Sequence, residues 1–198
     1  MSRPRLVIIG AGGHGGCVAD IAQLGGWHVA GYLDTQRNPG ECVGGHPILG
    51  GDRLLDDRDF VNQHAFALGI GDPEVRSAYG KKLITRGALV PAIINPNSLV
   101  SPHAEIGQGV VMLGFNAVNH QAIIQNFVVL DWNATVGHHS VVGEGVFLGP
   151  GVQITGHCRL GPHVYFGVGS RTVPKIEVGA GSIVGAGATV TKSLPEYV

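Results

Sequence analysis

An apolar residue recurs at every sixth position through the second half of the chain. The series runs Val100, Ile106, Met112, Val118, Ile124, Leu130, Val136, Val142, Leu148, Ile154, Leu160, Phe166, Val178, Val184 and Val190, with Thr172 as its break. The next residue is often glycine, as at Gly137 and Gly143, which suits a tight corner. Three hexads of strand and corner close one triangular coil, and stacked coils pair their strands about 4.8 Å apart. The sequence therefore predicts a left-handed parallel β-helix in which residues eighteen apart lie above one another.

Such a prism has flat walls and no deep cleft of its own. Sites are therefore expected between walls, and identical prisms packed about a threefold axis would form grooves at their seams. The alternative is a repeat that serves purely as a spacer. A preceding domain of quite different character disfavours that alternative.

The first ninety or so residues follow an α/β pattern. We expect strands over Leu6–Ile9 and Trp27–Leu33, a helix over Gly16–Leu24 between them, and a third strand over Ala65–Ile70. The chain therefore divides into a small Rossmann-like α/β domain at residues 1–95 and an all-β domain of hexapeptide repeats at residues 96–198.

The turn after the first strand reads GAGGHG, from Gly10 to Gly15. A GxGxxG turn lets the backbone approach a phosphate at a helix N-terminus, and Asp34 lies where it can accept a hydrogen bond from a ribose hydroxyl. A dinucleotide usually lies across two such halves, and this domain is long enough for one. The sequence favours a mononucleotide ligand, against the alternative of a glycine turn that merely packs helix on strand.

Composition narrows the classes of partner. Charged residues make up 14% of the chain and the formal net charge is −1, so nothing favours a nucleic acid or an anionic membrane surface. The apolar run Leu6–Ile9 is too short for a signal-peptide core or a membrane span, and we expect a cytoplasmic protein. The three cysteines are unclustered, which indicates neither a disulfide framework nor a zinc ribbon.

Several histidines fall into columns once the eighteen-residue coil is applied. His120 is predicted to lie on His138, and the neighbouring column contains His103, Gln121, His139 and His157. Imidazoles exchange protons near neutral pH, and Asp131 is a candidate to hold the second ring nitrogen of His138. If the strand is extended there, His139 should point to the opposite side. The columns leave two alternatives open: a solvated edge without function, and a zinc site on His103, His139 and His157.

The order of these motifs resembles a known family. GAGGHG, YLD, IGDPEVR and TVGHHSVVGEG, joined to a hexapeptide prism, are similar to the bacterial sugar acetyltransferases that include sialic acid O-acetyltransferase and the N-acetyltransferases of nucleotide-linked 4-amino sugars. The resemblance spans essentially the whole chain. It implies a homotrimer in which the N-terminal domain binds a nucleotide-sugar, acetyl-CoA lies along the seam between prisms, and a histidine of the β-helix acts as general base.

The resemblance also implies roles for individual residues. The base falls on His138; the nucleotide-sugar contacts fall on Gly13, His14 and Asp34; and the CoA contacts fall near Gly156, Val168 and Ala186. Three features depart from the family pattern. The base is followed by His139 instead of an acidic residue, Phe147 stands where relatives carry a histidine facing the thioester, and Lys192–Val198 replaces a short CoA-binding segment.

These observations predict an acetyl-CoA-dependent N-acetyltransferase that acts on a nucleotide-linked amino sugar and needs no metal. An amine is a better nucleophile than a hydroxyl, so it tolerates the loss of an ideal partner for the base. The alternatives are an O-acetyltransferase acting on a sugar such as sialic acid, a zinc enzyme of the γ-carbonic-anhydrase type, and a non-catalytic scaffold that binds a nucleotide-sugar. The zinc enzyme is disfavoured because it needs no nucleotide-binding domain and because no compact pair of ligands follows His139.

Overall fold

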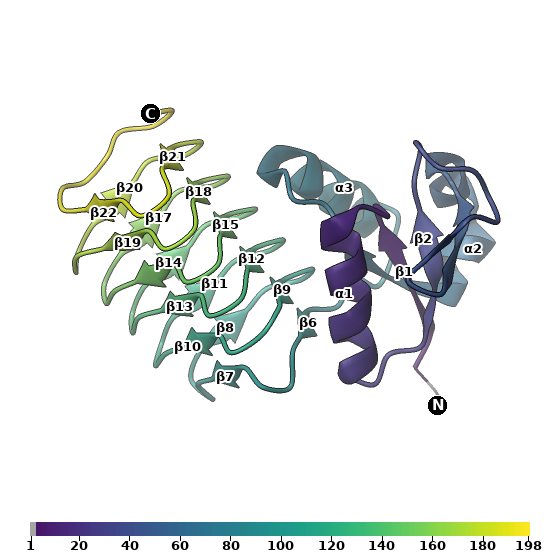
Figure 1. Cartoon of the computed structure of the whole chain (residues 1–198), viewed down its shortest axis with the longest axis horizontal. Helices are drawn as coiled ribbons and strands as arrows, with labels where there is room; N and C mark the ends of the chain where they lie inside the picture. The colour runs from purple at the N-terminus through teal and green to yellow at the C-terminus, as the bar shows by residue number, and fades with distance from the viewer. Residues whose placement is uncertain (1–2) are drawn as a thin grey trace.

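The computed structural model describes residues 3–198, which form an α/β part beside a triangular prism of short strands (Figure 1). Within these residues no helix combines the length and the apolar character needed to cross a bilayer. Both halves of the predicted architecture, the Rossmann-like α/β part and the left-handed β-helix, are confirmed.

The N-terminal part is a five-stranded sheet with the order β3-β4-β2-β1-β5. Its strands are β1 (Arg5–Ile9), β2 (Val29–Leu33), β3 (Cys42–Val43), β4 (His46–Gly50) and β5 (His64–Leu68), all parallel except β3. Its helices are α1 (Gly13–Leu24), the 3-10 helix η1 (Asp52–Asp56), α2 (Arg58–Gln63) and α3 (Pro73–Thr85). Helix α1 begins three residues earlier than predicted, and the sequence analysis did not predict the β3–β4 hairpin.

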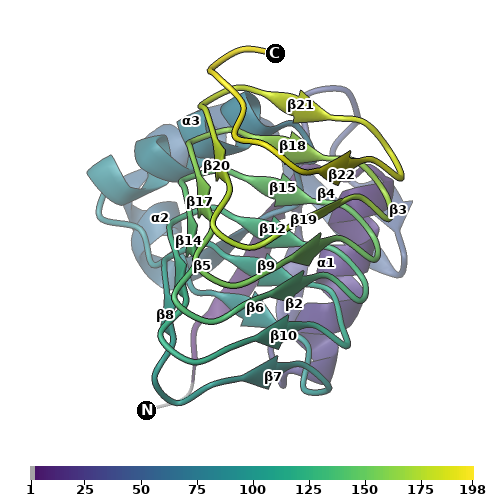
Figure 2. The same ribbon diagram turned by 90° about the vertical axis from the view of Figure 1, so that its left-hand side faces the viewer.

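The prism has three walls, each made of parallel two-residue strands one coil apart. Face 1 consists of β6 (Ile93–Ile94), β9 (Val111–Met112), β12 (Val129–Leu130), β15 (Phe147–Leu148), β18 (Tyr165–Phe166) and β21 (Ile183–Val184). Face 2 consists of β7 (Leu99–Val100), β10 (Ala117–Val118), β13 (Thr135–Val136), β16 (Gln153–Ile154), β19 (Arg171–Thr172) and β22 (Thr189–Val190). Face 3 consists of β8 (Glu105–Ile106), β11 (Ile123–Ile124), β14 (Val141–Val142), β17 (Arg159–Leu160) and β20 (Glu177–Val178). Figure 2 shows the stack of coils with the helices behind it.

The predicted register is confirmed strand by strand. Pairing partners lie eighteen residues apart, as in Ala117 with Thr135, and the apolar hexad residue is the second of each strand and forms most of the prism core. Thr172 keeps this register although its side chain is polar. It is buried, and its hydroxyl accepts a hydrogen bond from the backbone N–H of Thr155 at 3.1 Å, so the polar atom has a partner inside the core.

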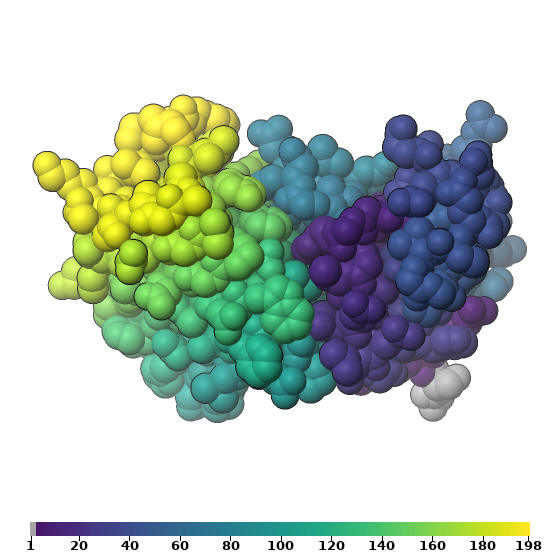
Figure 3. Space-filling model, in the orientation of Figure 1, coloured from purple at the N-terminus to yellow at the C-terminus, as the bar shows by residue number. Residues whose placement is uncertain are grey.

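The two parts share a hydrophobic core along face 1. The outward side chains of Val111, Val129 and Phe147 pack with buried residues of α1 and the sheet, so little of this wall faces solvent where the N-terminal part covers it. The space-filling view shows continuous contact between the two parts (Figure 3). Strand β6 already pairs within the prism, and the division at residues 95 and 96 stays a prediction.

Arg76 of α3 connects the N-terminal part to the prism, and we call this contact between the two parts the join. Its guanidinium is fully buried and donates to the carbonyl oxygens of Gly71 at 2.7 Å, Phe127 at 2.7 Å and Gly145 at 2.6 Å, which belong to both parts. Burial lowers the pKa of Arg76 to about 10, so the group is still charged at neutral pH. Backbone carbonyl groups, in place of a carboxylate, thus stabilise the positive charge of the Arg76 side chain.

Candidate active site

The glycine-rich turn leaves the start of α1 open. A Cβ on Gly15 would overlap the carbonyl oxygen of Gly10, so the turn needs glycine there to bring helix and strand together. Gly13 has open space around it, α1 has no side-chain cap, and its first turn carries no acidic residue. The first N–H groups of α1 are therefore available to an anionic ligand group.

Asp34 fastens this turn to the end of β2. One carboxylate oxygen accepts from the N–H of Ala11 and the other from the N–H of Gln36, each at 2.8 Å. Asp34 also borders a cavity of about 210 Å³ together with Gly10 and Tyr79. Each carboxylate oxygen retains a second lone pair, so the predicted contact to a ribose hydroxyl is compatible with the clamp.

His14 lies between the glycine turn and the prism. Its ring centroid is 6.1 Å from that of Phe147, and its buried Nε2 has no hydrogen-bond partner within residues 3–198. Burial, and to a lesser extent the positive charge of Arg76, lowers the pKa of His14 to about 4. The imidazole is therefore neutral at physiological pH and has an unused polar atom.

A larger pocket, of about 530 Å³, is lined by Phe147, the aromatic neighbour of His14. It lies between the loop that precedes α3, at residues 71–74, and a wall formed by Phe147, His163, Tyr165 and Ile183. Phe147 and Tyr165 stack at 5.1 Å with an angle of 11° between their rings. The pocket thus offers a flat aromatic wall with the ring of one histidine at its margin.

Five histidines gather on the edge between faces 2 and 3, which we call the histidine edge (corner residues 101–104, 119–122, 137–140 and 155–158). They are His103, His120, His138, His139 and His157. The predicted stacking of His139 on His157 is confirmed, with centroids 4.8 Å apart and an angle of 11°. His120 lies 4.8 Å from His103 and 5.9 Å from His139.

His139, and not Asp131, is the hydrogen-bond partner of His138. The two Nδ1 atoms lie 3.0 Å apart. The expectation that His139 points to the opposite side is wrong because His139 adopts a left-handed backbone conformation, with φ of 59°, instead of an extended one. Two adjacent imidazoles are thereby brought together.

Asp131 lies at another corner, between faces 1 and 2, on the far side of β13. Its carboxylate accepts from the N–H of Trp132 at 2.7 Å, and burial raises its pKa. Among residues 3–198 of one chain, no hydrogen bond joins Asp131 to His138. Asp131 lies before β13 and His138 lies after it, so the two side chains lie at opposite ends of this strand of face 2.

The predicted CoA contacts also divide between two edges. Gly156 lies on the histidine edge, where a Cβ would come within 2.8 Å of the His138 ring, so its glycine makes room for that imidazole. Val168 and Ala186 lie on the corners between faces 1 and 2, and both are exposed. Both edges border face 2, so within one chain a ligand that touches all three residues would have to lie across that wall.

The predicted nucleotide and base residues are likewise separated within one chain. Gly13, His14 and Asp34 belong to the part that covers face 1. The histidine edge joins faces 2 and 3 and is the one edge of the triangle that does not border face 1. Within one chain the predicted nucleotide residues and the predicted base therefore lie on opposite sides of the prism.

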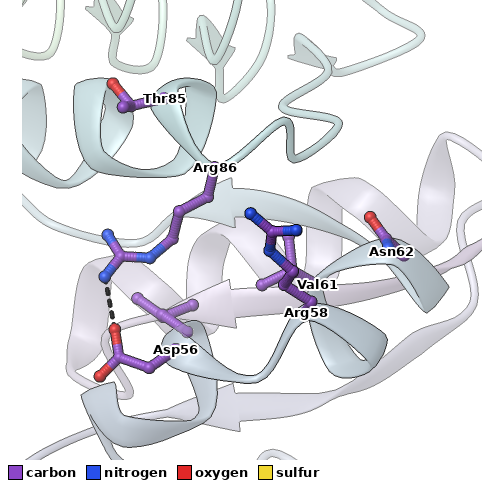
Figure 4. A pocket seen from close by; sticks show the side chains of 7 residues that line it. Asp56, Arg58, Val61, Asn62, Thr85 and Arg86 are labelled. Atoms are coloured by element: carbon purple, nitrogen blue, oxygen red, sulfur yellow. Dashed lines mark hydrogen bonds and ion pairs between the residues drawn. The ribbon is translucent and has the colours of Figure 1, made fainter.

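A further pocket of about 390 Å³ contains none of the predicted residues. It is lined by Asp56, Arg58 and Arg86 among others, and Asp56 and Arg86 form an ion pair within this lining (Figure 4). It lies among η1, α2 and the end of α3, away from the glycine turn and the histidine edge.

The sequence analysis missed Arg76, His163 and Tyr165. A signal for Tyr165 was present, because the first residue of every face 1 strand is apolar or aromatic, whereas those of faces 2 and 3 include Thr135, Gln153 and Glu105. That pattern marks the wall that another element covers. No local pattern distinguishes a buried Arg76 from a solvated arginine on α3.

Comparison with known proteins adds two family matches. The family described as the PglD N-terminal domain matches residues 5–83, and the bacterial transferase hexapeptide family (six repeats) matches residues 139–173.

Solved structures match over the whole chain. A mutant of perosamine N-acetyltransferase from Caulobacter crescentus, in complex with CoA and GDP-perosamine, superposes with a TM-score of 0.94 at 31% identity, covering 100% of this chain and 93% of that one. The acetyltransferase domain of PglB from Neisseria gonorrhoeae gives 0.93 at 31% identity, with 98% and 94% covered. WeeI from Acinetobacter baumannii gives 0.87 at 25% identity, with 98% and 94% covered.

Proposed function

Because the chain belongs to the nucleotide-sugar acetyltransferases built on a left-handed β-helix, we propose that it moves the acetyl group of acetyl-CoA to the amino group of a nucleotide-linked amino sugar, with His138 as general base. The protein is an acetyl-CoA-dependent sugar N-acetyltransferase. The C. crescentus relative was solved with CoA and GDP-perosamine, and the N. gonorrhoeae domain was also solved with acetyl coenzyme A.

The observation that carries the detailed proposal is the separation of the two half-sites. The glycine turn and His14 lie against face 1, and His138 lies on the opposite edge. A complete site then needs the N-terminal part of one chain and the histidine edge of a neighbour. Heterologous contacts form a ring when the rotation between neighbouring subunits closes, and we propose that it closes after three subunits, as a homotrimer.

We assign the ligands to the half-sites as follows. The nucleotide occupies the 210 Å³ cavity beside Asp34, its phosphates lie at the start of α1 near Gly13, and the sugar extends past His14 into the 530 Å³ pocket. Acetyl-CoA lies in the seam, against Gly156 of one prism and Val168 and Ala186 of the next. Small or short side chains there let an extended ligand lie close to the walls.

The chemistry then follows from one hydrogen bond. If the Nδ1–H of His138 donates to the Nδ1 of His139, the Nε2 of His138 is the unprotonated nitrogen and can take a proton. The amine attacks the thioester carbonyl, a C–N bond forms and the C–S bond breaks. The amine proton passes to His138 and from there to the departing CoA thiolate.

A subunit-mixing experiment tests this arrangement. Asp34→Ala weakens the nucleotide half-site and His138→Ala removes the base, so each variant alone should have little activity at a low concentration of the nucleotide-sugar. When the two variants are co-expressed, about a quarter of the sites should combine an intact Asp34 from one chain with an intact His138 from its neighbour. Acetyl transfer to a nucleotide-linked amino sugar, followed as released CoA thiol, should recover to about that fraction.

Two outcomes would contradict the proposal. No recovery in the mixed oligomer, with both variants folded and assembled, would place the whole site in one chain. Transfer to a hydroxyl with no transfer to an amine, read by mass spectrometry of the product, would make the protein an O-acetyltransferase.

A further inference from the structure

We propose that the histidine edge binds a divalent transition-metal ion, with Zn²⁺ as the probe, through His138, His139 and His157. One ligand atom of each side chain lies within 4.8 Å of the other two, and all three residues are exposed. The ion acts as a reversible inhibitor and not as a cofactor. The inhibitory consequence rests on the proposed role of His138 as base, whereas binding of the metal does not.

The geometry of the first two ligands is close to what zinc requires. Tetrahedral Zn–N bonds of about 2.0–2.1 Å place two ligand nitrogens roughly 3.3 Å apart. The Nδ1 atoms of His138 and His139 are 3.0 Å apart. In the metal-free pair a proton bridges them. When the ion binds, that proton moves to the Nε2 of its own ring, and both Nδ1 lone pairs face the metal.

The third ligand comes from the next coil. The backbone N–H of His157 donates to the carbonyl oxygen of His138 at 3.0 Å, which fixes the two corners one above the other. The His157 ring centroid is 5.1 Å from that of His138 and 4.8 Å from that of His139. Since the side chains are exposed, rotation of the His157 ring is enough to complete a three-nitrogen face with one open position.

The surroundings favour a borderline ion over a hard one. The cluster offers neutral nitrogen ligands, which suit zinc, copper and nickel, whereas magnesium and calcium prefer oxygen. His120 lies next to the three-histidine cluster, with its ring centroid 5.9 Å from that of His139. Coordination through Nδ1 leaves the Nε2 of His138 protonated, so this nitrogen can no longer take the amine proton.

The test measures binding directly, before any activity is read. Isothermal titration of the chelator-treated full chain with zinc chloride should show one saturable site per chain. Removing one of three ligands should weaken binding by at least about tenfold in His157→Ala. The matched control is His103→Ala, which removes a histidine of the same edge outside the cluster. It should bind like the unaltered chain, and magnesium chloride should not bind.

Activity then separates the metal site from the proposed function. Zinc at saturating concentration should stop acetyl transfer, and a chelator should restore it. Absence of saturable zinc binding, or equal affinities in the unaltered chain and His157→Ala, overturns the metal site. Saturable binding that weakens in His157→Ala while leaving the transfer rate unchanged supports the metal site and contradicts His138 as the base.

Discussion

His14 makes the stability of the fold depend on pH in a direction that the structure specifies. Its pKa is 6.5 when unperturbed and about 4 in the folded chain, so the unfolded state binds a proton more readily. The stabilisation is fully present above pH 6.5 and is lost as the pH falls towards 4. At about pH 5 the unfolded imidazole is almost fully protonated and the folded one is neutral. Linkage then lowers the free energy of unfolding by about 2 kcal/mol relative to about pH 7.5.

The assay is guanidinium unfolding at the two pH values, at one protein concentration, followed by tryptophan fluorescence of Trp27 and Trp132. Other groups also titrate, so the informative quantity is the difference between the unaltered chain and His14→Gln, which has no proton to bind. About 2 kcal/mol of the pH dependence should disappear in that variant. His28→Gln, at an exposed histidine, is the control and should leave it intact. An undiminished pH dependence in His14→Gln would refute the reasoning.

Three further predictions concern the site and the contact between the two parts. His138→Ala should lower kcat by about 10²-fold or more with little change in KM. His139→Ala should lower kcat less, because it removes only the hydrogen-bond partner of Nδ1 of His138, and Asp131→Asn should lower it least. Steady-state kinetics of the three variants measure this order. Asp34→Ala should weaken nucleotide-sugar binding by about tenfold or more through loss of a charge-assisted clamp, and calorimetry should find acetyl-CoA binding unchanged. Gly80→Ala would place a Cβ 2.4 Å from a ring carbon of Phe127, which packs on α3. This overlap should lower the free energy of unfolding by about 1–3 kcal/mol, measured by thermal unfolding.

The β-helix was predictable in detail because its signal repeats. Each coil needs an inward apolar residue at fixed spacing, so strand positions followed from counting, and even Thr172 was assigned correctly by its place in the series. The α/β part carries a single copy of each signal. Its helix start and third strand were therefore predicted to within a few residues, and the short β3–β4 hairpin was missed.

The pairing of side chains at the site was less predictable. Asp131 precedes His138 by only seven residues, but the two residues belong to corners at opposite ends of β13. A short separation along the chain therefore does not imply a short distance in a triangular coil. His139 is the true neighbour of His138 because its backbone has a left-handed φ. A glycine at this corner would have indicated that conformation in the sequence, whereas a histidine does not. The apolar first residues of the face 1 strands indicate which wall is covered, whereas the elements that cover it follow from tertiary packing alone.

The buried guanidinium of Arg76 fixes more than the stability of the join. Because it binds carbonyl groups of both parts at once, the N-terminal part cannot slide along the prism without breaking several hydrogen bonds in a dry interior. In the proposed trimer, this rigid join helps to fix the distance from the start of α1 to the histidine edge of the neighbouring chain. In the proposed reaction, the enzyme selects an acceptor by length: the diphosphate and sugar must together bridge that fixed span for the amine to reach its base.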